Sequence, residues 1–143
     1  MFLLDTNVLS ELRKVRAGRA DPGVAAWADS VDSIDLFVSC ITIEEIEIGV
    51  LLVERRDARQ GEVLREWFER HVLPAFADRI LPIDAAVART SARLHVPDRR
   101  SIRDGYIAAT ALVHRLTLVT RKTAAFASCG VSPLDPWLAV GKD

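Results

Sequence analysis

Residues 2–5, FLLD, are a short run of apolar side chains that ends in an acid. A continuous apolar run predicts a strand of a parallel sheet with both faces buried, because a strand with one solvent-exposed face alternates polar with apolar residues. Similar runs occupy 36–41, 79–83 and 116–120. We therefore expect four buried strands.

The stretches between these runs carry apolar residues at helical spacing. The expected helices are 7–14, 24–30, 42 to about 54 with Thr42 as N-cap, 58 to about 76, 85–94 capped by Asp84, and 102 to about 114 capped by Ser101. A short helix or turn at Phe126 should lead to a small edge strand. Strands that alternate with helices predict an α/β fold with a mainly parallel sheet, here as one domain over 1–143.

Composition narrows the class of protein. The 143 residues are 50% hydrophobic and 27% charged, and no apolar run approaches the length of a membrane span. Neither a signal peptide nor paired cysteine motifs are evident, so we expect a cytoplasmic protein with reduced thiols. A net charge of −1 argues against a protein that coats nucleic acid non-specifically.

Three acids are expected at one edge of the sheet. Asp5 ends the first strand, Glu45 lies just after the second, and Asp104 lies in the first turn of the helix that begins near Ser101. The carboxyl ends of parallel strands meet at one edge, where functional groups gather. Two such carboxylates at 4 Å repel by on the order of 4 kcal/mol at a dielectric near 20, so a cation is needed. Oxygen ligands favour Mg²⁺ or Mn²⁺ over zinc, and that chemistry suits phosphodiester hydrolysis.

Helix capping is the alternative role for two of these acids. Thr42-x-x-Glu45 and Ser101-x-x-Asp104 both match the capping box, in which the acid bonds the N-cap amide. Capping does not account for Asp5, because a buried acid at a strand end is costly without a partner.

Several segments together resemble the PIN-domain ribonucleases, and within them the VapC/FitB-like toxins of bacterial toxin–antitoxin pairs. They are LLDTNVLSEL (3–12), SCITIEEIEIG (39–49), RDGYIAATALVHRLTLVTR (103–121), CGV (129–131) and the Pro-Trp at 136–137. The resemblance implies a three-layer α/β/α fold, Mg²⁺-dependent cleavage of RNA, a homodimer, and a cognate VapB-like antitoxin.

The resemblance also assigns roles to residues. It places the metal-site acids at Asp5, Glu45 (rather than Glu44) and Asp104, by the I-T-x-x-E-I-x-x-G frame around the second acid. Substrate-binding positions carried over with less weight are Thr6, Asn7, Thr120 and Arg121. Asn7 equally suits the N-cap of the first helix.

Two positions depart from the family pattern. After the 116–120 strand such relatives usually have T-R-N-x-x-D-F, whereas here Lys122 replaces the amide and Ala125 replaces the acid. A lysine ammonium beside the carboxylates competes with a metal, unless Lys122 points into solvent. This keeps open a second hypothesis, an attenuated PIN-like module that mainly binds its antitoxin or RNA. A haloacid-dehalogenase-type phosphatase is disfavoured, because Asn7 stands where that chemistry needs an acid.

Two further features have open roles. Arg13, Lys14, Arg16 and Arg19 form a basic run that suits RNA phosphates, an acidic antitoxin tail, or a solvated loop. Trp27 and Trp67 suit core packing better than a partner groove.

Overall fold

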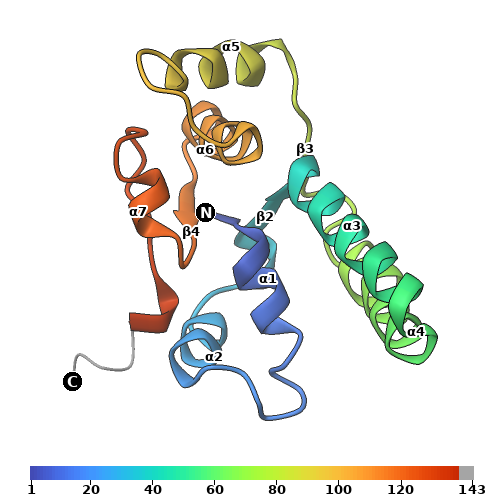
Figure 1. Ribbon diagram of the computed structural model, residues 1–143. Coiled ribbons are helices and arrows are strands. Elements are labelled where there is room, and N and C mark those ends of the chain that lie inside the picture. Colours follow the sequence, from blue (N-terminus) through green and yellow to red (C-terminus); the bar gives the residue numbers. More distant parts are fainter. Residues whose placement is uncertain (139–143) are drawn as a thin grey trace.

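The computed structural model describes residues 1–138, and within them four short strands form one sheet (Figure 1). The strands are β1 (Phe2–Leu4), β2 (Leu36–Ser39), β3 (Ile80–Leu81) and β4 (Thr117–Val119). Their order is β3-β2-β1-β4 and every pairing is parallel, with Phe2 opposite Leu36 on one side and Thr117 on the other. The prediction of a parallel α/β sheet is confirmed.

Helices cover both faces of this sheet. They are α1 (Thr6–Leu12), α2 (Pro22–Asp29), α3 (Cys40–Arg56), α4 (Ala58–Trp67), α5 (Ala85–Leu94), α6 (Ile102–His114) and α7 (Thr123–Phe126). A π-helical turn continues α4 over Phe68–Val72, and 3-10 turns lie at Ser33–Asp35 and Pro136–Leu138. Within residues 1–138, no helix has the length and apolar character that crossing a membrane requires.

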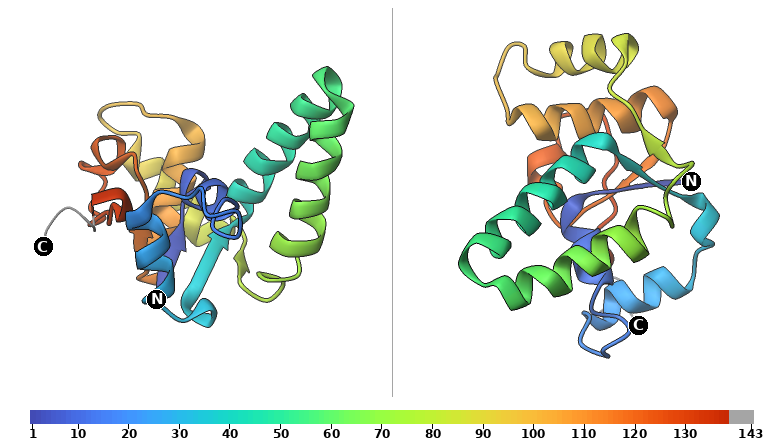
Figure 2. Two further views of the ribbon diagram at one scale, coloured as in Figure 1. Left: turned by 90° about the horizontal axis from the view of Figure 1, so that it is seen from below. Right: turned by 90° about the vertical axis from the view of Figure 1, so that its right-hand side faces the viewer.

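Neighbouring residues of β1 enter different cores. Leu4 packs with residues of α1 to α4, whereas Leu3 packs with Ile107 of α6 and Phe126 of α7. Both leucines are fully buried, because successive side chains of a strand point to opposite faces. In Figure 2 the sheet lies between α6, with α5 outside it, and the layer that contains α1 and α2. The three-layer α/β/α fold is confirmed.

Capping residues explain where several helices begin and end. The carboxylate of Asp84 accepts a hydrogen bond from the amide of Val87 at 3.0 Å, as predicted for α5. Asp21 caps α2 and is followed by Pro22, which is favourable in the first turn because it has no N–H to leave unpaired. α6 ends at Arg115, which adopts a left-handed conformation with φ of 56°.

The predicted start of α3 was wrong. Strand β2 ends at Ser39 rather than at residue 41, and Ser39 caps the helix by accepting from the amide of Ile41 at 3.0 Å. Thr42 is instead buried in the helix, and its Oγ1 has no hydrogen-bond partner among the described residues. Because Ser39 caps a helix that begins at Cys40, Thr42 lies inside the first turn, and the capping box at Thr42 and Glu45 does not form.

Other boundaries moved by a few residues. The strands at 79–83 and 116–120 shorten to Ile80–Leu81 and Thr117–Val119, and the helix expected to reach about 76 changes to a π-turn after Trp67. The small edge strand is a single parallel bridge between Val119 and Leu134. Trp27 is in the core, 8% exposed, with its ring edge-on to Phe2 at 5.4 Å.

Candidate active site

Asp5 is the most constrained of the three acids. It follows β1, caps α1, and is 1% exposed. Its Oδ1 accepts from the amide of Thr6 at 2.8 Å, and its Oδ2 accepts from the Thr120 hydroxyl at 2.7 Å and the Asn7 amide at 3.2 Å. The buried carboxylate is therefore held by neutral donors from two chain segments, which offsets its desolvation without a direct ion pair.

Asn7 ties the turn after β1 to the turn after β4. Its Nδ2 also donates to Thr120 Oγ1 at 3.3 Å, and its Oδ1 accepts from the amide of Arg121 at 3.1 Å. The helix cap is Asp5, so the alternative role of Asn7 as N-cap is wrong. Thr120 is fully buried, and its Oγ1 further accepts from the amide of Lys122 at 3.0 Å. These bonds fix the relative position of two strand ends.

Glu45 joins this network through Thr6. Thr6 Oγ1 donates to Glu45 Oε1 at 2.5 Å, while the neighbouring Glu44 forms an exposed ion pair with Arg103 at 3.6 Å. Because α3 begins at Cys40, Glu45 lies in its second turn, away from the free amides of the first. The carboxylate is thus not used for capping.

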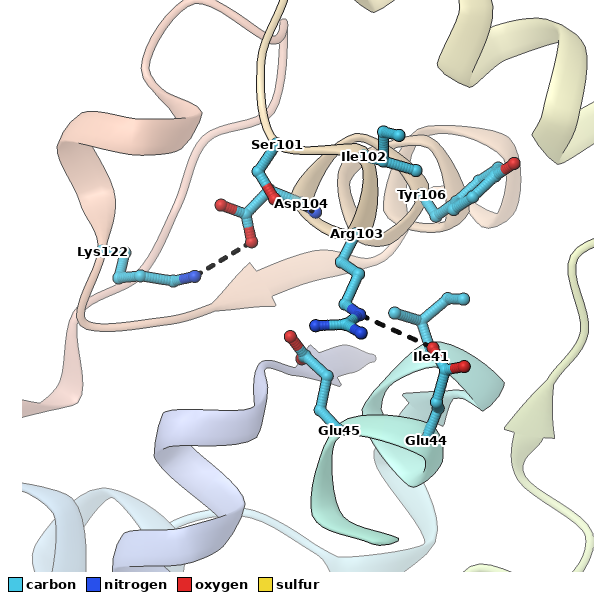
Figure 3. A pocket seen from close by; sticks show the side chains of 9 residues that line it. All are labelled: Ile41, Glu44, Glu45, Ser101, Ile102, Arg103, Asp104, Tyr106 and Lys122. Carbon is cyan, nitrogen blue, oxygen red and sulfur yellow. Dashed lines mark hydrogen bonds and ion pairs between the residues drawn. The ribbon is translucent and has the colours of Figure 1, made fainter. Parts of the chain in front are cut away.

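Asp104 lies in the first turn of α6, which Ser101 caps as predicted, with Ser101 Oγ accepting from the Asp104 amide at 3.4 Å. The Asp104 carboxylate does not return to the cap. Its Oδ1 instead accepts from Lys122 Nζ at 2.9 Å (Figure 3). Lys122 therefore points at the acids and not into solvent.

Lys122 pairs directly with Asp104, and Asp5 and Glu45 act on it through their charges. Partial burial disfavours its charged form, but the hydrogen bond to Asp104 and the negative charges of Asp5, Asp104 and Glu45 outweigh it, so the pKa of Lys122 is raised. Its side chain is still 47% exposed, whereas that of Asp104 is 16% exposed. The ammonium partly neutralises a cluster that would otherwise carry three negative charges.

The chemistry of the donors fits a hard divalent cation, because Asp5, Glu45 and Asp104 offer oxygen ligands alone. As the side chains stand, however, no three Asp, Glu, His or Cys residues within positions 1–138 converge tightly enough to hold a metal ion. Lys122 occupies one oxygen of Asp104. A cation that binds Asp104 through Oδ1 must therefore displace this ammonium.

A cavity of about 480 Å³ opens beside Glu45 and Asp104 (Figure 3). Its lining residues are Ile41, Glu44, Glu45, Ser101, Ile102, Arg103, Asp104, Tyr106 and Lys122. The sequence interpretation missed Ile102 and Tyr106, although their spacing of four residues predicts one shared face of a helix. Ile41, Ile102 and Tyr106 line this cavity together with six polar or charged residues, so it can take a ligand that has both polar and apolar parts.

Arg121 lies outside this cavity. Its guanidinium stacks on the ring of Trp137, with 5.0 Å between the guanidinium carbon and the ring centroid, and its side chain is exposed. Trp137 belongs to the 3-10 turn that follows Asp135. This contact brings the C-terminal Pro-Trp pair next to the strand end that carries Thr120.

Comparison with known proteins finds relatives along nearly the whole chain. A family model for the PIN domain matches residues 2–128. The chain is 41% identical to the toxin FitB of Neisseria gonorrhoeae, covering 96% of this chain and 99% of that protein. It is 37% identical to the VapC ribonuclease Y4jK of Sinorhizobium fredii, covering 96% and 98%.

Solved structures agree with the sequence relatives. The crystal structure of FitAcB from Neisseria gonorrhoeae superposes with a TM-score of 0.86 at 39% identity, over 96% of this chain and 99% of that one. A toxin–antitoxin complex from Klebsiella pneumoniae gives a TM-score of 0.67 at 26% identity, over 95% and 98%.

Proposed function

We propose that this chain, which belongs to the PIN-domain family, is a metal-dependent endoribonuclease that acts as the toxin of a toxin–antitoxin pair. Similar proteins are named as a toxin and as ribonucleases, and similar structures are toxin–antitoxin complexes. By the same likeness, we propose a VapB-like antitoxin as partner, a homodimer, and action in the cytoplasm.

One observation carries the catalytic part of the proposal. Asp5 follows β1, Glu45 lies in the second turn of α3 after β2, and Asp104 lies in the first turn of α6. Lys122 Nζ donates to Asp104 Oδ1 at 2.9 Å, and the negative charges of all three acids act on this ammonium. Asp5 and Glu45 are further linked through the adjacent backbone amide and hydroxyl of Thr6. We assign the three acids as ligands of Mg²⁺, for which Mn²⁺ substitutes. Such a cation, when bound, polarises a phosphate and lowers the pKa of a nearby water.

The other residues hold this arrangement and the substrate. Thr120 and Asn7 donate to Asp5 and keep its carboxylate oriented, and the Thr6 hydroxyl does the same for Glu45. The cavity beside Asp104 has the volume to take one nucleotide, with Tyr106 in its wall. Hydrolysis adds a water oxygen to phosphorus and breaks the bond to the leaving sugar oxygen, which takes up a proton.

A charge-neutral substitution at Asp5 tests the proposal. Asp5→Asn should abolish Mg²⁺-dependent cleavage of RNA and the inhibition of growth on expression, because the amide removes a ligand charge while nearly keeping its shape. Asp29→Asn is the matched control, since Asp29 is exposed on α2 and removes the same charge far from the acids. Cleavage by Asp5→Asn at the rate of the parent would refute the assignment.

The contact between Lys122 and Asp104 favours a second candidate, an attenuated module that mainly binds its antitoxin or RNA. In this case the ammonium keeps the acids from loading metal, and Ala125 offers no acid to compensate. Introducing Lys122→Asn together with Ala125→Asp should then raise Mg²⁺-dependent cleavage strongly. An unchanged rate in this double variant would reject attenuation.

A further inference from the structure

A cationic groove lies beyond the C-terminal end of α1. Two cavities, of about 460 and 290 Å³, share Arg13 as a lining residue. Lys14 and Arg19 line the first, and Arg16, Trp67 and His71 line the second. We call Arg13, Lys14, Arg16, Arg19, Trp67 and His71 the α1 groove.

Most of the cationic side chains of this groove are not paired with a carboxylate among the described residues. Lys14 pairs with Glu11 at 3.2 Å, but no carboxylate among residues 1–138 forms an ion pair with Arg13, Arg16 or Arg19. All three arginines are exposed. In a chain whose net charge is −1, this is a local concentration of unneutralised cations.

An aromatic ring lies within the groove. The guanidinium of Arg13 is over the Trp67 ring, 5.9 Å from its centroid, and Trp67 is partly buried against the core. Core packing of Trp67 was the favoured prediction, and the structure adds a second contact at the surface. A guanidinium stacked on an indole presents a flat cationic surface of the kind on which nucleobases stack.

Helix α1 connects the groove to the candidate active site. Its first residue, Thr6, bonds both Asp5 and Glu45, and its last, Leu12, precedes Arg13. Seven residues at 1.5 Å each span about 10 Å, or about three nucleotide steps of a stacked strand.

Arg121 lies beside this path. The pKa of Glu11 is lowered chiefly by the hydrogen bond from the amide of Asp21, and also by the positive charges of Lys14 and Arg121. The backbone amide of Arg121 donates to Asn7 Oδ1 at 3.1 Å, so Arg121 lies next to the first turn of α1.

We propose that the α1 groove binds the backbone phosphates of a single-stranded RNA segment next to the cleaved bond, with Arg13 and Trp67 as a stacking surface for one base. This rests on the proposed function only in taking RNA as the substrate. Arginine forks match phosphate oxygens, and stacking adds affinity for a base that a carboxylate-rich peptide does not supply. RNA is therefore favoured over an acidic protein tail.

Binding without metal tests the groove apart from cleavage. The probe is a labelled oligouridine of about 12 nucleotides in EDTA, with affinity measured by fluorescence anisotropy over a range of salt concentrations. The variant combines Arg13→Ala, Arg16→Ala and Arg19→Ala. Three lost phosphate contacts should reduce the salt slope by about 2 and weaken binding about a hundredfold at about 0.1 M salt.

Helix α5 and the loop after it offer a matched control. Arg89, Arg93 and Arg99 are exposed and, among the described residues, form no ion pair, so replacing all three by Ala removes the same charge. In Figure 2, α5 lies outside α6, on the other side of the sheet from α1. The control should bind RNA within about twofold of the parent, and circular dichroism should show that both variants are folded.

These binding results test the groove separately from the nuclease function. Equal RNA affinity of the two triple variants, or no RNA binding by the parent, would overturn the proposal. So would a loss confined to a labelled polyglutamate peptide, which would assign the groove to a protein partner. If the groove variant loses RNA affinity while the parent fails to cleave RNA with Mg²⁺, the groove stands and the nuclease function fails.

Discussion

Removing the charge of Lys122 should strengthen metal binding. Lys122→Met keeps most of the side-chain length and frees the Asp104 oxygen that the ammonium holds at 2.9 Å. A hydrogen bond between charged groups contributes about 1.5–3 kcal/mol. Lys122 is 47% exposed, so solvent screening reduces this to about 1–2 kcal/mol. The dissociation constant for Mn²⁺ should therefore fall about 5- to 30-fold, at 1.4 kcal/mol per factor of ten.

Calorimetric titration of Mn²⁺ into metal-free protein measures this shift. Lys14→Met is the control, because Lys14 pairs with Glu11 at 3.2 Å, is similarly exposed at 45%, and carries no contact to the three acids. It should leave the Mn²⁺ affinity unchanged.

A second readout is thermal stability without metal. The melting temperature of Lys122→Met should fall by a few degrees, roughly 2–4 °C per kcal/mol, since Asp104 loses the cation that it pairs with and the charges of Asp5 and Glu45 are no longer partly neutralised. Added Mn²⁺ should restore it. A Mn²⁺ affinity within twofold of the parent would refute the view that Lys122 competes with a metal for Asp104.

Three further substitutions test the contacts of Asp5, the packing of α3 on α4 and the charge of Glu11. Thr120→Val removes the hydroxyl that donates to buried Asp5 and should cost about 1–3 kcal/mol in urea unfolding; no loss would contradict this role. Gly61→Ala places a Cβ 2.6 Å from Glu54 Cα and should destabilise the α3–α4 contact by about 1–3 kcal/mol; a neutral result would mean the helices shift freely. The pKa of Glu11 is lower in the folded protein than its value of 4.5 in the unfolded chain, so the ionised carboxylate stabilises the fold fully above pH 4.5. This stabilisation is lost as pH falls through the folded pKa. In Glu11→Gln, the free energy of unfolding should therefore fall less steeply as pH is lowered.

Local sequence patterns were sufficient to predict the strands and helices and the order in which they alternate. The continuous apolar runs predicted strands buried on both faces, and Leu3 and Leu4 indeed enter opposite cores. Asp84 and Ser101 cap their helices because an oxygen directly before a helix meets unpaired amides there. Thr42 failed as a cap because Ser39 offered the same oxygen earlier, and sequence spacing does not choose between two hydroxyls that both suit.

The sequence alone determined that Asp5, Glu45 and Asp104 stand at or just beyond strand or helix ends, because chain order and the parallel sheet dictate which edge those ends share. Only the tertiary structure decided what each carboxylate contacts. Thr6, 39 residues before Glu45 in the chain, donates to Glu45, and Lys122, 18 residues after Asp104, donates to Asp104 Oδ1. Such partners depend on side-chain directions across the sheet edge, which no local periodicity encodes.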